Sequence, residues 1–130
     1  MIEFQLDRRS GVTTYMQLVQ QVRQALRLGL LEPGDQLPTA KEVVGQLAIN
    51  PNTVLKAYRE LEREGLVAPR PGQGTFVQRS LASPSLGAAS VLRRDLASWV
   101  RSAQAAGLGE EDVRALLDAT VRDCFAAGVA

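Results

Sequence analysis

Apolar residues recur at every third or fourth position after Thr14, and this spacing predicts an amphipathic helix. Its apolar stripe consists of Tyr15, Leu18, Val19, Val22, Leu26 and Leu30. The side chains expected on its solvent side are Gln17, Gln20, Arg23, Gln24 and Arg27. Because glycine suits the position that follows a helix, we expect this helix to end near Gly29.

Two shorter helices are predicted after a Pro-Gly turn at residues 32–35. Thr39 and Glu42 have the spacing of a capping box, in which the hydroxyl bonds a helix amide and the carboxylate reaches back. The buried face of this second helix is expected to hold Val43, Val44 and Leu47. A third helix should begin at Asn50 and Pro51, because asparagine is a favoured N-cap and proline a favoured first helical residue.

The third helix carries one apolar face and should end at Gly65. That face consists of Val54, Ala57, Tyr58 and Leu61. Two helices joined by about three residues have the proportions of a helix-turn-helix. The pattern then becomes extended, with two short strands at 66–69 and 75–78 joined by the basic, glycine-rich residues 70–74. Three helices followed by such a hairpin make a winged helix.

The last third of the chain is predicted to be helical. Residues 80–85 are small and polar with a proline, which indicates a linker. Two stripes follow, one ending at Gly107 and one starting after the acidic residues 110–112, which suit a helix N-terminus. The stripes are Leu92, Leu96, Trp99, Val100 and Ala103, then Val113, Leu116, Leu117, Val121 and Phe125. The predicted fold is mainly α with a small β-hairpin, a winged helix-turn-helix domain at 1–79 and a helical unit at 80–130.

Composition narrows the function classes. The 130 residues are 45% apolar and 22% charged, as in an ordinary globular protein that can bury a core. There is no histidine, which excludes Ser/His/Asp triads, Cys/His dyads and zinc fingers. We therefore expect no catalytic residues, no metal site and no cofactor. Neither a signal peptide nor a membrane span is recognisable, so we expect a cytoplasmic protein.

The net charge of +1 does not by itself indicate a nucleic-acid partner, so the placement of the charges matters. The exposed side of the third helix offers Asn50, Asn52, Thr53, Lys56 and Arg59. Amides and hydroxyls can bond base edges or phosphates, and Lys41 and Arg70 could neutralise backbone charge beside them. In the alternative interpretation Asn50 only caps the helix and the rest is a solvated face, since winged modules also mediate protein contacts.

The hairpin tip contains Gly72, Gln73 and Gly74. A phosphate-binding glycine loop would sit between a strand and a helix, whereas a strand follows here. A tight hairpin turn explains these glycines better. A tip without bulky side chains could also lie against the minor groove or its phosphates, with Arg70 and Gln73 making contact.

Two helices of this size have little interior of their own, so we expect their stripes to form a dimer interface. The interface residues predicted are Leu92, Leu96, Trp99, Val100, Leu116, Leu117, Val121 and Phe125. In the alternative interpretation, Trp99 and Phe125 line a ligand pocket. Cys124 is the single cysteine and is expected to be a small buried residue beside Phe125, with a redox-sensing role as the alternative.

Residues 13–77 resemble the winged-helix DNA-binding domain of the GntR family of bacterial transcription regulators. The residues that carry the resemblance are Tyr15-x-Gln17-Leu18, Gly29-x-Leu31-x-Pro33-Gly34-Asp35-x-Leu37-Pro38-Thr39, Asn52-Thr53-Val54, Ala57-Tyr58-x-x-Leu61-Glu62-x-Glu64-Gly65 and Gly72-x-Gly74-Thr75-Phe76-Val77. The Asn-Pro-Asn-Thr-Val form and the short tail are similar to the YtrA-like subfamily. That resemblance implies a two-helix dimerisation domain and, in many members, a repressor beside ABC transporter genes.

Two departures from the family pattern affect the expected contacts. Relatives usually carry Ser-x-Arg at positions 39–41, where the arginine touches DNA; Lys41 keeps the charge but loses the bidentate fork. Relatives often carry arginines where this chain has Pro51 and Leu55. The expected base readers are therefore Asn52 and Thr53.

The sequence thus predicts a homodimeric transcription regulator, a repressor that binds double-stranded DNA at a palindromic operator with half-sites about 10 bp or a multiple apart. The predicted DNA-contacting residues are Thr39, Lys41, Asn50, Asn52, Thr53, Lys56, Arg59, Arg70, Gly72, Gln73 and Gly74. The alternative is a winged-helix module that binds another protein and no DNA. The sequence leaves open whether a small-molecule effector binds.

Overall fold

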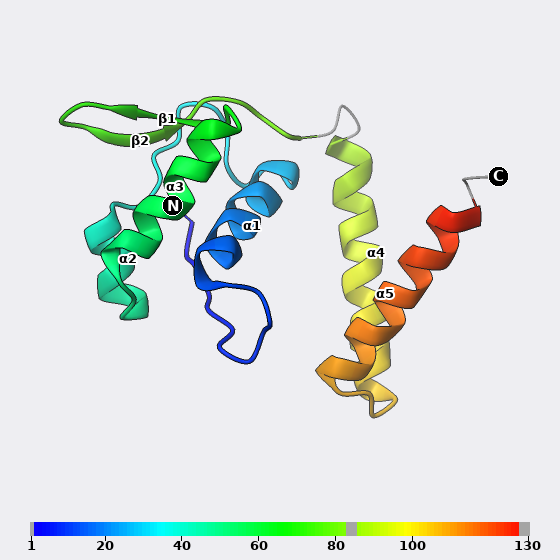
Figure 1. The fold of residues 1–130 in the computed structure, drawn as a ribbon. Coiled ribbons are helices and arrows are strands. Elements are labelled where there is room, and N and C mark those ends of the chain that lie inside the picture. Colours follow the sequence, from blue (N-terminus) through cyan, green and yellow to red (C-terminus); the bar gives the residue numbers. More distant parts are fainter. Residues whose placement is uncertain (1, 83–85, 128–130) are drawn as a thin grey trace. The chain divides into compact units, whose positions relative to one another are not determined.

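The computed structural model describes residues 2–82 and 86–127, which fall into two compact units, Met1–Leu86 and Gly87–Ala130 (Figure 1). The N-terminal unit contains α1 (Thr14–Arg27), α2 (Ala40–Leu47), α3 (Pro51–Arg63), β1 (Val67–Arg70) and β2 (Gly74–Val77). The second unit is made by α4 (Leu86–Ala105) and α5 (Glu110–Ala127). This order confirms the predicted fold class. Within the predicted linker, residues 83–85 lie outside the described residues.

Helices α1 and α3 end in the same way, at the glycines that the sequence indicated. Gly29 and Gly65 have φ angles of 73° and 76°, where only glycine is unstrained. The next residue then reaches back five positions: Leu30 N donates to Ala25 O at 2.8 Å, and Leu66 N donates to Leu61 O at 3.0 Å. These bonds satisfy carbonyls that the helix end leaves over.

Leu30 does not belong to the buried stripe of α1, contrary to the sequence prediction. The helix ends at Arg27, and Leu30 follows the turn at Gly29 with 59% of its surface exposed. The other five apolar positions of the stripe lie at least half-buried, with Leu18, Val19, Val22 and Leu26 fully buried. The regular spacing continued one turn beyond the helix itself, and the glycine decided where the helix stopped.

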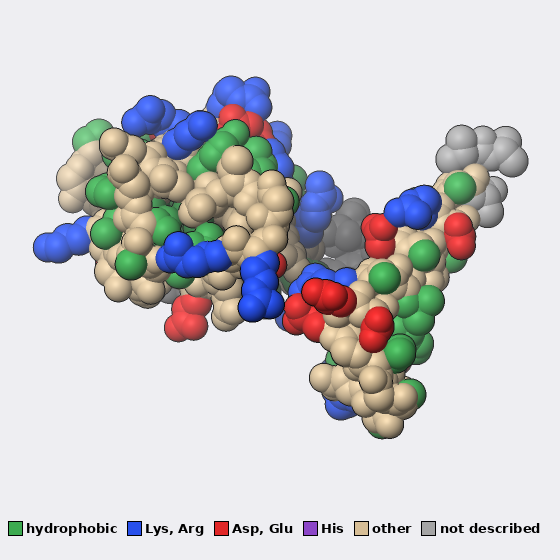
Figure 2. Space-filling view, turned by 60° about the horizontal axis from the view of Figure 1, so that its bottom comes forward, with side chains coloured by type: hydrophobic (Ala, Val, Ile, Leu, Met, Phe, Trp, Pro, Cys, Tyr) green, Lys and Arg blue, Asp and Glu red, His purple; other side chains and the backbone are tan. Residues whose placement is uncertain are grey.

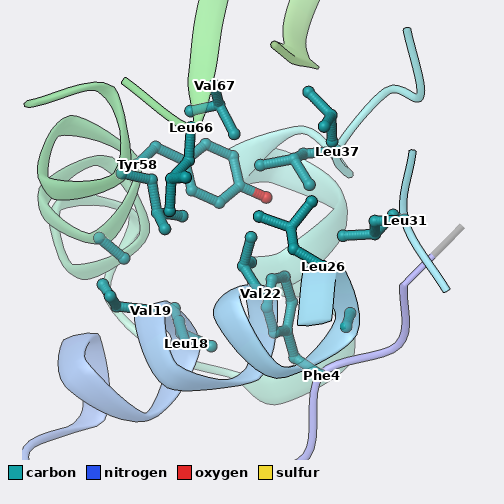
Figure 3. Packing of buried hydrophobic residues seen from close by; sticks show 14 of the residues in the cluster. Phe4, Leu18, Val19, Val22, Leu26, Leu31, Leu37, Tyr58, Leu66 and Val67 are labelled. Carbon is teal, nitrogen blue, oxygen red and sulfur yellow. The ribbon is translucent and has the colours of Figure 1, made fainter. Parts of the chain in front are cut away.

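The core of the N-terminal unit lies between α1, α3 and the segments around them (Figure 3). It includes Leu18, Val22, Leu26, Leu37, Val43, Val54, Leu61, Leu66, Val67 and Val77. Burial of one large apolar side chain contributes about 1.5–3 kcal/mol. The phenol of Tyr58 is the polar group among them, and its hydroxyl donates to Pro38 O at 2.6 Å. That bond fixes α3 against the segment that leads into α2.

Gln17 is buried, although the helical spacing placed it on the solvent side of α1. Its Oε1 accepts from Asp7 N at 2.9 Å, and its Nε2 donates to Asp7 O and Val12 O, each at 2.9 Å. The side chain therefore holds the loop before α1 against the helix. Phe4, which lies earlier in the same N-terminal segment, is buried in the core.

The wing is the antiparallel hairpin of β1 and β2, paired from Val67↔Val77 to Arg70↔Gly74. Each strand is shifted by one residue from its predicted bounds. The chain before α2 runs along the other edge of β2: Leu37 N donates to Thr75 O at 2.9 Å and Val77 N to Asp35 O at 2.7 Å. Strand β2 is thus central, and β1 is the edge strand.

The second unit is a helical hairpin. Its turn is closed by Asp112, whose Oδ2 accepts from Gly109 N at 3.1 Å. Ala103 and Val113 are buried beside this turn, and the two helices diverge away from it (Figure 1). Among the described residues, no helix combines the length and apolar character needed to cross a membrane.

Candidate nucleic-acid interface

Helix α3 presents a polar first turn because its opposite face is committed to the core. Asn50 caps the helix as predicted, with Oδ1 accepting from Asn52 N at 2.8 Å, and Pro51 is the first helical residue. Asn52 is exposed and Thr53 half-buried, so both side chains remain accessible to a ligand. The side-chain oxygen of Asn50 is thus engaged within its own helix, as in an N-cap.

The second polar terminus belongs to α2. Thr39 forms the predicted capping box: its Oγ1 accepts from Glu42 N at 3.1 Å, and Thr39 N donates to Glu42 Oε1 at 3.2 Å. The hydroxyl of Thr39 also donates to Glu42 Oε1, so it is already engaged. Lys41 is exposed in the first turn of α2 and is free to face a phosphate.

Lys56 lies against α1, which the sequence did not indicate. Its Nζ is 4.0 Å from the centre of the Tyr15 ring. A cation over an aromatic face gains about 0.5–1 kcal/mol at an exposed site. Lys56 and the next basic residue, Arg59, are both exposed, and within the described residues neither forms an ion pair. These two charges are therefore available on the outer side of α3.

Charge is distributed unevenly along α3. At its C-terminal end, Arg23 donates to both carboxylate oxygens of Glu64, at 2.9 and 2.5 Å, and Arg63 pairs with Glu60. The hydrogen bond to Glu64 raises the pKa of Arg23, and the hydrogen bond from Arg63 lowers the pKa of Glu60. The acidic residues of α3, Glu60 and Glu62, lie toward this end, whereas Lys56 is the one charged residue of its N-terminal half. Lys56 and Arg59 therefore lie between the polar first turn of α3 and its acidic end.

The wing carries a further basic side chain. The Arg70 guanidinium carbon lies 4.1 Å from the centre of the Phe76 ring, so the side chain is stacked on β2. At the exposed tip, Gly72 has a φ of 74° after Pro71, and Gln73 N donates to Arg70 O at 2.9 Å, as in a tight turn. Figure 2 shows lysine and arginine side chains standing out at several places on one face of the N-terminal unit.

Gln36 is a functional candidate that the sequence did not reveal. Its Nε2 donates to Gln73 O at 3.0 Å, which joins the wing tip to the segment before α2. An expected contact at this tip, Gln73, therefore uses its backbone carbonyl internally while its side chain stays exposed. No sequence pattern pairs residues 37 positions apart, so this link required the structure.

The apolar stripes of α4 and α5 are largely uncovered in the second unit, and Figure 2 shows hydrophobic side chains along one side of it. Of the predicted interface residues, Val100 and Leu117 are half-buried. The exposed ones are Leu92, Leu96, Trp99, Leu116, Val121 and Phe125. Cys124 is also exposed, so the expectation that it is buried beside Phe125 was wrong, and Phe125 is itself 75% exposed.

A hollow of about 430 Å³ lies between α4 and α5 near their turn. It is lined by Val100, Gln104, Leu108, Gly109, Glu110, Val113, Arg114 and Leu117. Trp99 and Phe125, the two residues considered for a ligand pocket, are not part of this lining. Within residues 2–82 and 86–127, no cluster of three acidic or cysteine side chains is arranged to hold a metal ion.

Comparison with known proteins identifies similar chains and similar folds. Residues 14–77 match the family described as "Bacterial regulatory proteins, gntR family". The HTH-type transcriptional repressor YtrA of Bacillus subtilis (strain 168) is 35% identical over 105 residues, which are 80% of this chain and 81% of that protein.

Two solved structures are similar to this one over almost the whole chain. The Transcriptional Antiterminator from Listeria monocytogenes EGD-e has a TM-score of 0.56 and 29% identity, covering 94% of this chain and 92% of that one. YtrA from Sulfolobus acidocaldarius, a GntR-family transcription factor, has a TM-score of 0.53 and 25% identity, covering 92% and 97%.

Proposed function

Because this chain belongs to the GntR family and is a DNA-binding transcription regulator of that family, we propose that it acts as a homodimeric repressor that binds a palindromic operator. The observation that carries the proposal is the exposed, polar first turn of α3. Behind it, Lys56 and Arg59 form no ion pair within the described residues, and the wing carries a further basic side chain, Arg70. The Bacillus subtilis relative is a transcriptional repressor, which supports repression. Repression requires only that the bound dimer occlude a promoter, and no chemistry on the protein's part.

In this proposal α3 enters the major groove with its first turn toward the base edges. Asn52 can bond adenine through both ends of its amide, and the Thr53 hydroxyl can bond a base edge or a phosphate. Lys56 and Arg59 follow on the exposed side and contact the sugar-phosphate backbone. Because Pro51 and Leu55 offer no such groups, sequence reading depends mainly on short neutral side chains.

The remaining proposed contacts come from α2 and the wing. Lys41 at the start of α2 and Arg70 on β1 neutralise phosphates on either side of α3. Thr39 and Asn50, the N-caps of α2 and α3, contribute further polar contacts at the two helix starts. The wing tip, Gly72 to Gly74, lies along the minor groove or its phosphates. Each phosphate neutralised releases counterions and contributes about 0.9 to the slope of log K against log salt.

The dimer is proposed to form through the apolar stripes of α4 and α5. Six of the eight predicted interface side chains are exposed, and such an apolar surface is unusual for a stable monomer. A second copy of the same helical hairpin would cover them through a two-fold axis. The two α3 helices would then meet successive major grooves, about 10 bp or a multiple apart.

The proposal is tested by selecting bound sequences from a random DNA pool with the full-length protein. We expect an inverted repeat, because a two-fold dimer reads the same half-site twice. Recovery of a single unrepeated site would contradict the dimer, and recovery of no sequence would contradict specific binding. By resemblance to YtrA-like regulators, we also propose that the target is an ABC transporter operon. In that case the promoter of the operon should contain the selected inverted repeat.

A further inference from the structure

The tip of the wing has little support of its own. Each strand of the hairpin is four residues long, and Pro69 in β1 has no N–H to donate. A two-stranded hairpin on its own is marginal in water. Backbone bonds from the segment before α2 reach β2 as far as Thr75, and the turn at residues 71–73 extends past them.

One side chain bridges that gap. Gln36 Nε2 donates to Gln73 O at 3.0 Å, and among the described residues this is the hydrogen bond that joins the tip to the protein outside the hairpin. The same amide fills the space beside Gly74: a Cβ there would lie 2.6 Å from Gln36 Nε2. Gly74 also has a φ of 130°, so its backbone and its missing side chain both fit the amide.

The segment that carries Gln36 also holds the two helices of the helix-turn-helix. Pro38 O accepts from the Tyr58 hydroxyl of α3 at 2.6 Å. Thr39, the next residue, caps α2. A short stretch of chain, buried at Leu37 and Pro38, thus connects the wing tip, α3 and the start of α2.

We propose that Gln36 is a positioning residue that fixes the wing tip, with Arg70 stacked on Phe76, at a set place relative to α3. This inference rests on the proposed DNA-binding function. Its physical basis is preorganisation: a tip that is already ordered does not lose conformational freedom on binding, so α3 and the wing engage DNA together at lower cost. Gln36 itself need not touch DNA.

The test uses full-length protein and the selected operator. Gln36→Met keeps an unbranched side chain of similar length but removes the amide donor. A hydrogen bond of this kind contributes modestly, so we expect operator affinity to fall roughly three- to tenfold. Gln24→Met is the matched control, because Gln24 is exposed on α1 and its side chain has no hydrogen bond among the described residues. The control should bind like the wild type.

A double-mutant comparison separates positioning from direct contact. If Gln36 acts by placing Arg70, Gln36→Met should cost less than twofold once Arg70→Ala has already removed that side chain. An equal loss in both backgrounds would show that Gln36 acts independently of Arg70 and would overturn the proposal. No loss in the wild-type background would overturn it as well.

Amide hydrogen exchange without DNA supplies the second measurement. The Gln73 amide, bonded to Arg70 O, should exchange several-fold faster in Gln36→Met, while amides of α1 keep their rates. Unchanged exchange at residues 72–74 would overturn the positioning role whatever the DNA data show. Conversely, a wild-type protein that binds no DNA would contradict the proposed function, while faster exchange would still establish the Gln36 contact.

Discussion

Asn52 and Thr53 follow Pro51 in the first turn of α3, whose N-cap, Asn50, already uses its side chain within the helix. The Oδ1 of Asn50 accepts from Asn52 N, and the hydroxyl oxygen of Thr39 accepts from Glu42 N in the same way. A side chain that stabilises a helix start has less capacity left for a ligand. The side chains of Asn52 and Thr53 carry no such bond among the described residues, so sequence reading is assigned to them.

We predict different binding behaviour for readers and charge carriers. Asn52→Ala or Thr53→Ala should weaken binding to the selected operator by ~1–3 kcal/mol and affect random DNA much less, because a base contact is lost. Lys41→Ala or Arg70→Ala should weaken binding to both DNAs alike and lower the salt slope by about one phosphate. Fluorescence anisotropy at several salt concentrations measures both quantities. Identical behaviour of all four variants would contradict this assignment.

At the scale of elements, α3 is held at its middle and at its C-terminal end by contacts that are distant in sequence. Tyr58 bonds Pro38 near the start of α2, and Glu64 bonds Arg23 of α1, 41 positions away. Burial raises the pKa of the Tyr58 phenol above its usual value of 10.0. The neutral, hydrogen-bonded phenol is thus the form that the fold requires.

Tyr58→Phe should lower the free energy of unfolding by about 1–2 kcal/mol, because the buried Pro38 carbonyl loses its donor. The wild type should also lose stability as the pH rises above about 10, since the unfolded chain releases the phenolic proton while the folded chain retains it. Tyr58→Phe should lack that part of the alkaline loss. Urea denaturation from pH 7 upward measures both effects.

Tyr15→Phe is the matched control for this prediction, because the Tyr15 hydroxyl has no hydrogen bond within the described residues and its ring can still support Lys56. It should unfold at nearly the same urea concentration as the wild type. Equal destabilisation by the two substitutions would mean that the Tyr58–Pro38 bond does not hold α3 in place.

For the whole molecule, the exposed stripes of α4 and α5 are the main unexplained surface. We predict that Leu92→Gln and Phe125→Gln, at positions 64% and 75% exposed, weaken the dimer by about tenfold or more each, because each removes one apolar side chain from the proposed interface. Sedimentation analysis over a range of concentrations measures the dimer dissociation constant.

Leu30→Gln is the corresponding control. Leu30 is 59% exposed in the N-terminal unit and lies outside the proposed interface, so its substitution should leave dimerisation unchanged. If all three variants sediment like the wild type, the interface must lie elsewhere on the protein. If the control weakens the dimer as much as the others, the effect does not report the α4–α5 stripes.

The sequence by itself determined the features that depend on neighbouring residues. Helical spacing identified the buried faces of α1 and α3, the capping box started α2, and Asn50-Pro51 started α3. The glycines 29 and 65 marked helix ends, because only glycine takes the required positive φ without strain. Caps, spacing and turn residues act within a few positions, so the sequence displays them directly.

Tertiary structure decided which polar side chains serve the fold and which remain available. Gln17 has the spacing of a solvent-facing residue but is buried by its bonds to Asp7 and Val12. Gln36 meets the wing tip 37 positions away, and Lys56 leans on Tyr15 of another helix. Periodicity shows at which positions apolar residues recur along the chain. The partner of a polar side chain depends instead on which distant segments pack against it.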